Sequence, residues 1–235
     1  MNVTECRAAS PSGKSLILLP PTGGTNLIDR SYAKRFCNEG YDVYLLNDWS
    51  RPGEVGSDLS FHQHAYTNSQ RAIRLTLARI KTPFIGLIGT SVGATYAAVA
   101  ANTFPEIKAV LFIVGGVPLP RVIVTSDHSS MTTLHKARFE RFKFENDDQY
   151  EAAINREFNL EPTRLGSLHE AKDFAAVIAL NDTTVPFETQ KNLLDFFKPR
   201  KVITLSSSHF WAILKTWLFH TDELVSFFNE SAATS

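Results

Sequence analysis

Short apolar runs alternate with amphipathic segments along most of this 235-residue chain. The runs are rich in β-branched and aromatic residues, as is typical of buried strands. Between them, apolar residues recur at helical spacing, as at Ile73, Leu77 and Ile80, and a last helix is expected from about Trp211 to Phe228. This alternation predicts an α/β fold with a mainly parallel sheet of about six strands and helices on both faces. The expected strands are Ser15–Pro20, Tyr41–Leu46, Phe84–Gly89, Ala109–Gly115, Ala175–Leu180 and Lys201–Leu205.

Residues 117–174 interrupt the alternation with charge-rich helical patterns, such as Tyr150, Ile154 and Phe158 spaced four apart. An insertion at the carboxyl ends of two core strands would lie over that edge of the sheet. We therefore expect residues 1–116 and 175–235 to form the core, and residues 117–174 to form a small helical cap over a substrate pocket. A surface excursion far from any site is the alternative, because such apolar stripes are mainly packing features.

The segment Gly89-Thr90-Ser91-Val92-Gly93 joins an expected strand to an alanine-rich helix. A G-x-S-x-G sequence in this setting predicts a nucleophile elbow, a sharp turn that lifts one serine clear of the sheet. The backbone at Ser91 should be strained, and the flanking glycines remove side chains that would collide at the turn. An ordinary strand-to-helix turn with a surface serine is the alternative.

A serine hydroxyl is a weak nucleophile and needs a base, usually a histidine that a carboxylate orients. Asp182 follows the fifth expected strand, and His209 follows the sixth. Because the carboxyl ends of parallel strands meet at one edge of a sheet, we expect both side chains to lie near Ser91.

Other carboxylates and histidines are weaker candidates. Asp48 follows an earlier strand, Asp173 precedes its strand, and Glu188 starts a helix that should point it away. A lone histidine is more often structural than catalytic. The remaining histidines weighed on that ground are His128, His135, His169 and His220.

Attack by a serine creates a tetrahedral oxyanion, which needs preorganised N–H donors. The backbone N–H of Val92, directly after the nucleophile and at a helix N-terminus, is one expected donor. The second should come from the loop after the first strand, where Pro20 and Pro21 have no N–H and leave Thr22 or Gly23. We favour Thr22, and a merely flexible turn is the alternative.

Charge and composition narrow the class of partner. Lys plus Arg number 24, as do Asp plus Glu, and no basic tract is present, which argues against nucleic acid or an anionic membrane as the main partner. The first fifteen residues hold no apolar run long enough for a signal peptide or a membrane span, so a cytoplasmic location is expected.

Two short features suggest metal or redox chemistry but are given simpler interpretations. His62-Gln63-His64 lacks a third ligand at suitable spacing and is expected to be a polar loop, so no metal or other cofactor is expected. Cys6 and Cys37 form a single possible pair, and Cys37, in a helical pattern, is expected to be a buried or half-buried structural thiol.

Taken in order, these segments resemble the α/β-hydrolase superfamily over nearly the whole chain. The matching features are a first strand, a glycine-containing oxyanion loop, the G-T-S-V-G elbow, a D-T-T-V-P acid loop and an S-H-F base loop. The resemblance implies a Ser91–His209–Asp182 triad that works through an acyl-enzyme. The chain departs from the family where Pro20-Pro21 replaces the usual His-Gly, and its N-terminus leaves too little room for two leading antiparallel strands, so a trimmed sheet edge is expected.

Serine as nucleophile excludes the dehalogenases and epoxide hydrolases of this superfamily, which use a carboxylate at the elbow. We therefore predict a serine hydrolase, specifically a carboxylesterase whose partner is a small-molecule acyl ester. An acyl thioesterase is the nearest alternative. A catalytically silent hydrolase fold that serves as a ligand receptor is the alternative from another class. The pattern predicts neither the physiological substrate nor the oligomeric state.

Overall fold

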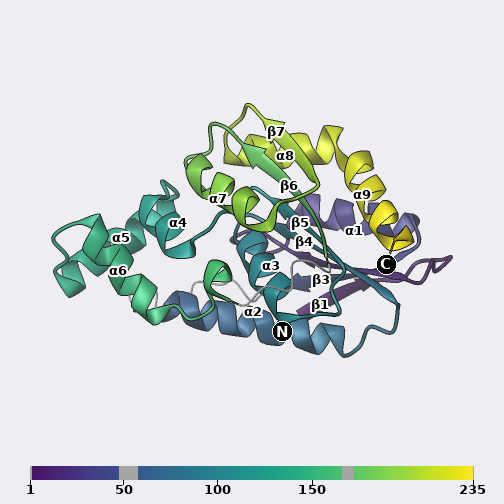
Figure 1. The fold of residues 1–235 in the computed structure, drawn as a ribbon, viewed down its shortest axis with the longest axis horizontal. Coiled ribbons are helices and arrows are strands. Elements are labelled where there is room, and N and C mark those ends of the chain that lie inside the picture. The colour runs from purple at the N-terminus through teal and green to yellow at the C-terminus, as the bar shows by residue number, and fades with distance from the viewer. Residues whose placement is uncertain (1, 48–57, 166–171, 235) are drawn as a thin grey trace.

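The computed structural model describes residues 2–47, 58–165 and 172–234, and a seven-stranded sheet runs through its centre (Figure 1). The strand order is β1-β3-β2-β4-β5-β6-β7, and all neighbours are parallel except β1, which pairs antiparallel with β3. The strands are β1 (Asn2–Cys6), β2 (Lys14–Leu19), β3 (Tyr41–Asn47), β4 (Phe84–Thr90), β5 (Ala109–Ile113), β6 (Asp173–Ala179) and β7 (Lys201–Leu205). The six expected strands are confirmed.

The expectation of a trimmed sheet edge is wrong in part, because β1 adds a seventh strand at that edge. Val3 and Cys6 of β1 pack against the clusters on opposite faces of the sheet, while Thr4 is exposed. An edge strand has only one neighbour and can remain mostly polar, so this one carries no apolar run that a sequence pattern would detect.

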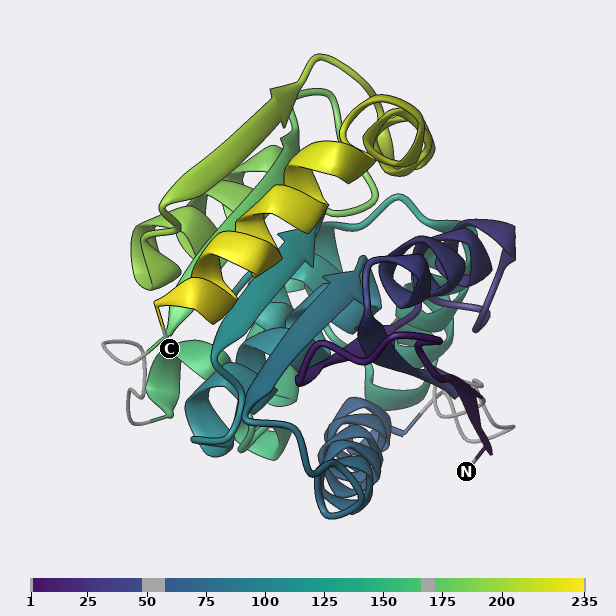
Figure 2. The same ribbon diagram turned by 90° about the vertical axis from the view of Figure 1, so that its right-hand side faces the viewer.

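Helices cover both faces of the sheet (Figure 2). Residues Leu16 and Leu18 of β2 point to one face, whereas Ile17 and Leu19 point to the other, and all four are buried. This two-sided burial explains why the central strands are continuous apolar runs. The first face packs against α1 (Leu27–Asn38), α8 (His209–Phe219) and α9 (Thr221–Ala233), and the second against α2 (Phe61–Leu77), α3 (Val92–Thr103) and α7 (Phe187–Phe197).

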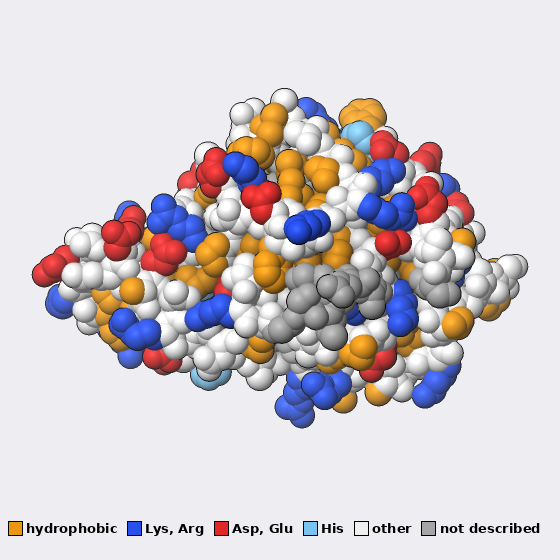
Figure 3. Space-filling model, viewed as in Figure 1, with side chains coloured by type: hydrophobic (Ala, Val, Ile, Leu, Met, Phe, Trp, Pro, Cys, Tyr) orange, Lys and Arg blue, Asp and Glu red, His pale blue; other side chains and the backbone are white. Residues whose placement is uncertain are grey.

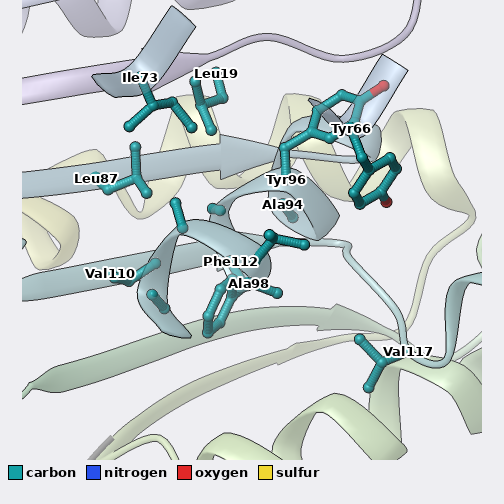
Figure 4. Close-up of a cluster of buried hydrophobic side chains, with 14 of the residues drawn as sticks. Leu19, Tyr66, Ile73, Leu87, Ala94, Tyr96, Ala98, Val110, Phe112 and Val117 are labelled. Atoms are coloured by element: carbon teal, nitrogen blue, oxygen red, sulfur yellow. The ribbon is translucent and has the colours of Figure 1, made fainter. Parts of the chain in front are cut away.

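Small side chains let α3 lie close to the sheet. Ala94 and Ala98 are completely buried beside Phe112 of β5 (Figure 4). On the side of α3 that faces α2, the rings of Tyr66 and Tyr96 meet edge to face with centroids 4.4 Å apart. The helix that follows the elbow is therefore fixed between the sheet and α2.

Two helix boundaries differ from the expected ones. The last helix is split at His220 into α8 and α9, where the Thr221 hydroxyl bonds back to the carbonyl oxygen of Trp217 at 2.6 Å. Helix α2 starts at Phe61, so His62-Gln63-His64 is helical and the expectation of a polar loop there is wrong.

The described part of the segment 117–174 before β6, residues 117–165, is mainly helical, as expected, and projects beyond the end of the sheet at the left of Figure 1. It contains α4 (Leu119–Thr125), α5 (Ser129–Phe142), α6 (Asp147–Glu157) and a 3₁₀ turn at Pro162–Arg164. Its status as a separate cap stays a prediction.

A disulfide joins Cys6 of β1 to Cys37 of α1, which corrects the expectation that Cys37 is a structural thiol. Basic and acidic side chains are intermixed over the face shown in Figure 3, in keeping with their equal numbers. Of the helices in the described residues, none combines the length and apolar character needed to cross a bilayer.

Candidate active site

Ser91 occupies a strained turn between β4 and α3. Its backbone dihedrals are φ 55° and ψ −120°, in a region that non-glycine residues rarely adopt, which confirms the expected strain. The turn is held in place because the Ser91 N–H donates to the carbonyl oxygen of Ile113 in β5 at 2.8 Å.

The glycines of the elbow are required by close backbone approaches. A Cβ at Gly89 would collide with the backbone of Gly93 and Ala94, and a Cβ at Gly93 would collide with the carbonyl oxygens of Leu19 and Pro20. The loop after β2 therefore crosses directly over the start of α3, next to Ser91.

The structure brings His209 and Asp182 together with Ser91. Nε2 of His209 lies 2.9 Å from the Ser91 hydroxyl oxygen, and Nδ1 lies 2.7 Å from Oδ2 of Asp182. A carboxylate only accepts hydrogen bonds, so this arrangement places the imidazole proton on Nδ1 and leaves Nε2 free to accept the hydroxyl proton. The Asp182 side chain is fully buried and that of His209 is 16% exposed.

Four donors surround the Asp182 carboxylate. Oδ1 accepts from the backbone N–H groups of Thr184 and Val185, at 3.0 and 2.9 Å, and Oδ2 accepts from His209 and from Nε2 of Gln190 at 2.9 Å. Such donors fix the orientation of the carboxylate.

Gln190 is the site residue that the sequence analysis missed. It is completely buried in α7, donates also to the carbonyl oxygen of Val185 at 2.7 Å, and accepts from the Ala179 N–H at 3.0 Å. A glutamine in an amphipathic helix has the pattern of a solvated position, and no sequence signal marks it as a partner of Asp182.

The loop after β2 forms a tight turn at the edge of the site. The N–H of Gly24 donates to the carbonyl oxygen of Pro21 at 3.1 Å, and Gly23 has φ +95°. A positive φ at the third position is characteristic of a type II turn and explains the glycine there. Thr22 is in this turn, and Val92 is the first residue of α3, where a helix N–H has no intrahelical acceptor.

A cavity of about 1190 Å³ opens beside these residues. Ser91, His209, Thr22 and Val92 all line it, whereas Asp182 lies behind the imidazole. Side chains of α2, α4 and α5 supply other parts of the wall, among them Tyr66, Val122 and Leu134.

Of the competing carboxylates, the two in the described residues, Glu188 and Asp173, do not line the cavity at Ser91. Glu188 is exposed on α7, and Asp173 begins β6 and pairs with Arg200 at 3.4 Å. Asp48 and His169 lie outside the described residues.

The competing histidines have other contacts. His135 pairs with Asp147 and His220 with Glu223, both at 2.7 Å. His128 caps α5 through Nδ1 and also lines the cavity.

His62 lies in the wall of the cavity, on α2. Burial, with a smaller effect of the nearby Arg138 cation, lowers the pKa of His62 to about 3, so the imidazole is neutral near pH 7. Within the described residues, no group of three or more His, Cys, Asp or Glu side chains is arranged to hold a metal ion.

The family model for the BAAT / acyl-CoA thioester hydrolase C-terminal domain matches residues 64–190, more than half of the chain. The chain belongs to this family. The matched stretch includes Ser91 and Asp182 and ends before His209. A search of curated proteins finds no match.

Solved structures with the same fold extend over almost the whole chain. Est1E from Butyrivibrio proteoclasticus has a TM-score of 0.67 and 14% identity, covering 98% of this chain and 94% of that one. A structure from a study of carboxylesterases of the thaumarchaeon Nitrososphaera gargenis has a TM-score of 0.62 and 15% identity, with 100% and 96% covered. The α/β hydrolase GrgF from Penicillium sp. sh18 has a TM-score of 0.64 and 16% identity, with 97% and 93% covered. This member of the BAAT / acyl-CoA thioester hydrolase family thus has the α/β-hydrolase fold.

Proposed function

We propose that the protein is a serine hydrolase in which Ser91, His209 and Asp182 form a catalytic triad that cleaves carboxylic esters. The observation that carries this proposal is the continuous pair of hydrogen bonds, 2.9 Å from Ser91 to His209 and 2.7 Å from His209 to Asp182. These distances lie within the range in which a base can accept a proton from a nucleophile.

In the proposed reaction, the Ser91 hydroxyl oxygen attacks the carbonyl carbon of the ester while Nε2 of His209 takes the hydroxyl proton. The tetrahedral intermediate then breaks its bond to the alcohol oxygen, and His209 returns the proton to the departing alcohol. Water attacks the acyl-Ser91 by the same steps in the second half, which releases the acid and restores the hydroxyl. Asp182 holds the tautomer and stabilises the imidazolium.

The oxyanion is proposed to accept from the N–H groups of Val92 and Thr22. Both residues line the cavity with Ser91, and the loop that carries Thr22 crosses over the start of α3. The positive end of the α3 dipole at Val92 favours negative charge at this point.

The segment 117–174 is proposed to act as a cap over the site. Besides lining the cavity, it is tied to the acid loop, because Asp127 accepts from the hydroxyls of Thr183 and Thr184 at 2.5 and 3.1 Å. The loop that presents Asp182 is thereby anchored to the start of α5.

A thioesterase is the second candidate, and the family name favours it. The same triad would attack a thioester carbonyl, so the geometry serves both bonds. A ligand receptor without catalysis is the remaining alternative, and it predicts no covalent chemistry at Ser91.

Labelling with a fluorophosphonate probe tests the proposal. We expect a covalent adduct on Ser91, located by mass spectrometry, and hydrolysis of p-nitrophenyl butyrate that falls on the order of 10⁴-fold or more in Ser91→Ala. Ser226→Ala is the matched control, because Ser226 is exposed on α9 and bonds only to Glu230 among the described side chains. An unlabelled Ser91 together with similar rates in both variants would favour the receptor.

The cytoplasmic location stays a prediction, and the Cys6–Cys37 disulfide weakens it. Structural disulfides persist in oxidising compartments and are rare in the cytosol.

A further inference from the structure

The cavity beside Ser91 is larger than most small-molecule sites. Its volume of about 1190 Å³ compares with roughly 300–1,000 Å³ for typical ligand pockets. Much of the wall is apolar, with contributions from Leu119 and Ile123 of α4, Met131 and Leu134 of α5, and Phe61 of α2. An extended or bulky apolar acyl group would bury its surface here, and each buried methylene would contribute to binding.

The mouth of the cavity carries two large apolar side chains among polar ones such as Thr22, Asn26 and Ser208. Leu27 at the start of α1 and Phe210 at the start of α8 both line the cavity, although 82% and 62% of their surfaces are exposed to solvent. Phe210 directly follows His209, the residue that would return the proton to the leaving group. One large apolar side chain of the mouth therefore directly adjoins, in the chain, the imidazole that would return the proton.

Polar groups also line the described part of the cavity wall. They are mainly hydroxyls, such as Ser126, Ser130 and Thr133 on the α4–α5 side, together with the amide of Asn26 and imidazoles. The described residues of the wall include no lysine, arginine, aspartate or glutamate. Coenzyme A carries several phosphate groups, which proteins bind with cationic side chains or clustered N–H donors and which lose hydration energy against apolar surface.

We propose that the physiological substrate joins a large apolar acyl group to an uncharged leaving group, and that acyl-CoA is a poor substrate. This inference rests on the proposed function and refines it, because it concerns the charge of the leaving group rather than the choice between oxygen and sulfur. Neutral esters and thioesters of uncharged thiols both satisfy it.

A matched set of decanoyl substrates tests the charge of the leaving group separately from the proposed hydrolase function. The set is the p-nitrophenyl ester, the N-acetylcysteamine thioester and the CoA thioester, each used below its micellar concentration. We expect kcat/KM for the N-acetylcysteamine thioester to exceed that for decanoyl-CoA by roughly 10-fold or more, because both carry the same thioester bond and only one carries phosphates. Equal or faster hydrolysis of decanoyl-CoA would overturn the inference while leaving a serine hydrolase in place. No hydrolysis of any of the three, with no fluorophosphonate adduct on Ser91, would instead overturn the proposed function.

A pair of variants on one helix tests where the leaving group passes. Phe210→Lys places a cation at the mouth, and Phe219→Lys places the same cation at the far end of α8, on a side chain that is 73% exposed and does not line the cavity. We expect Phe210→Lys to reduce the preference for the N-acetylcysteamine thioester over decanoyl-CoA several-fold, and to lose this effect as NaCl rises from about 0.05 to 0.5 M. Phe219→Lys should leave the preference unchanged. Because the ratio of kcat/KM for the two thioesters is taken within one variant, a loss of proton transfer by His209 that slows both reactions equally does not change it. An unchanged ratio in Phe210→Lys would refute the assignment of this rim to the leaving group.

Discussion

Removing the carboxamide of Gln190 should slow catalysis without weakening substrate binding. Gln190 does not line the cavity, yet it supplies one of the four donors to the Asp182 carboxylate. A hydrogen bond to a charged group contributes about 1.5–3 kcal/mol. If most of that is needed to hold Asp182 against His209 in the transition state, Gln190→Leu lowers kcat by roughly 10- to 100-fold, since each 1.4 kcal/mol is about tenfold.

Gln190→Leu also lowers the free energy of unfolding, and the assay must separate this loss from the effect on the position of Asp182. Leucine cannot bond to the Ala179 N–H or to the Val185 carbonyl oxygen, which both bond to Gln190. Each unsatisfied group lowers the free energy of unfolding by about 1–3 kcal/mol, and the more apolar leucine side chain offsets part of this loss. A total loss of about 2–6 kcal/mol lowers Tm by roughly 4–24 °C in a chain of this length. Rates are therefore measured at 20 °C or below and divided by the concentration of sites that react with a fluorophosphonate.

Thr189→Val is the matched control. Thr189 is the preceding residue of α7, equally buried, and its hydroxyl donates to the carbonyl oxygen of Pro186 at 2.7 Å instead of to Asp182. We expect Thr189→Val to lose stability with kcat per titrated site unchanged. If Gln190→Leu also keeps its kcat per titrated site, Gln190 only supports the fold and does not position Asp182.

Two further predictions concern stability. Burial raises the pKa of Asp29 to about 6 from an ordinary value of 3.8, so the free energy of unfolding should fall by about 3 kcal/mol as pH rises from about 4 to 6, and Asp29→Asn should abolish this fall. The lowered pKa of His62 has the opposite effect, because it makes the free energy of unfolding fall as the pH drops below about 6.5. The contribution of Asp29 is therefore isolated by the difference in urea midpoint between Asp29→Asn and wild type, measured at about pH 4.5 and at about pH 7.5. An equal difference at the two pH values would contradict the prediction. Replacing Cys6 and Cys37 by serine reopens a loop of 31 residues and should lower the free energy of unfolding by roughly 3–4 kcal/mol, and an unchanged denaturation midpoint would show that the disulfide constrains nothing.

The sequence could predict the arrangement of the core because connectivity and burial restrict it strongly. Strands buried on both faces are continuous apolar runs, and parallel strands bring their carboxyl ends to one edge. Residues that follow β4, β6 and β7 must therefore meet there, whatever the packing of individual side chains. That is why Ser91, Asp182 and His209 could be named from chain order before any distance was known.

Polar residues inside the fold are less predictable, because their partners are chosen by packing. The middle of α2 buries Ser69 and Gln70, whose Oγ and Nε2 donate to the carbonyl oxygens of Tyr66 and Tyr96, so polar residues interrupt the apolar period of its inner face. A hydrogen-bonded polar side chain costs little to bury, and a pattern of hydropathy cannot distinguish it from a solvated one.

Asp182 could be named from the sequence, whereas Gln190 could not, because different features of the fold position the two side chains. Asp182 takes its position from the end of a strand, which chain order constrains to within a few residues. Gln190 depends instead on the rotation of α7 about its own axis, where a shift of one residue, about 100°, would turn its carboxamide away from the acid loop. That rotation is set by Leu193 and Phe197, which pack on the sheet from the same helix. The orientation of the Asp182 carboxylate is thus linked to apolar packing outside the cavity wall, and substitutions at those two positions should alter kcat through Gln190 rather than through any contact with substrate.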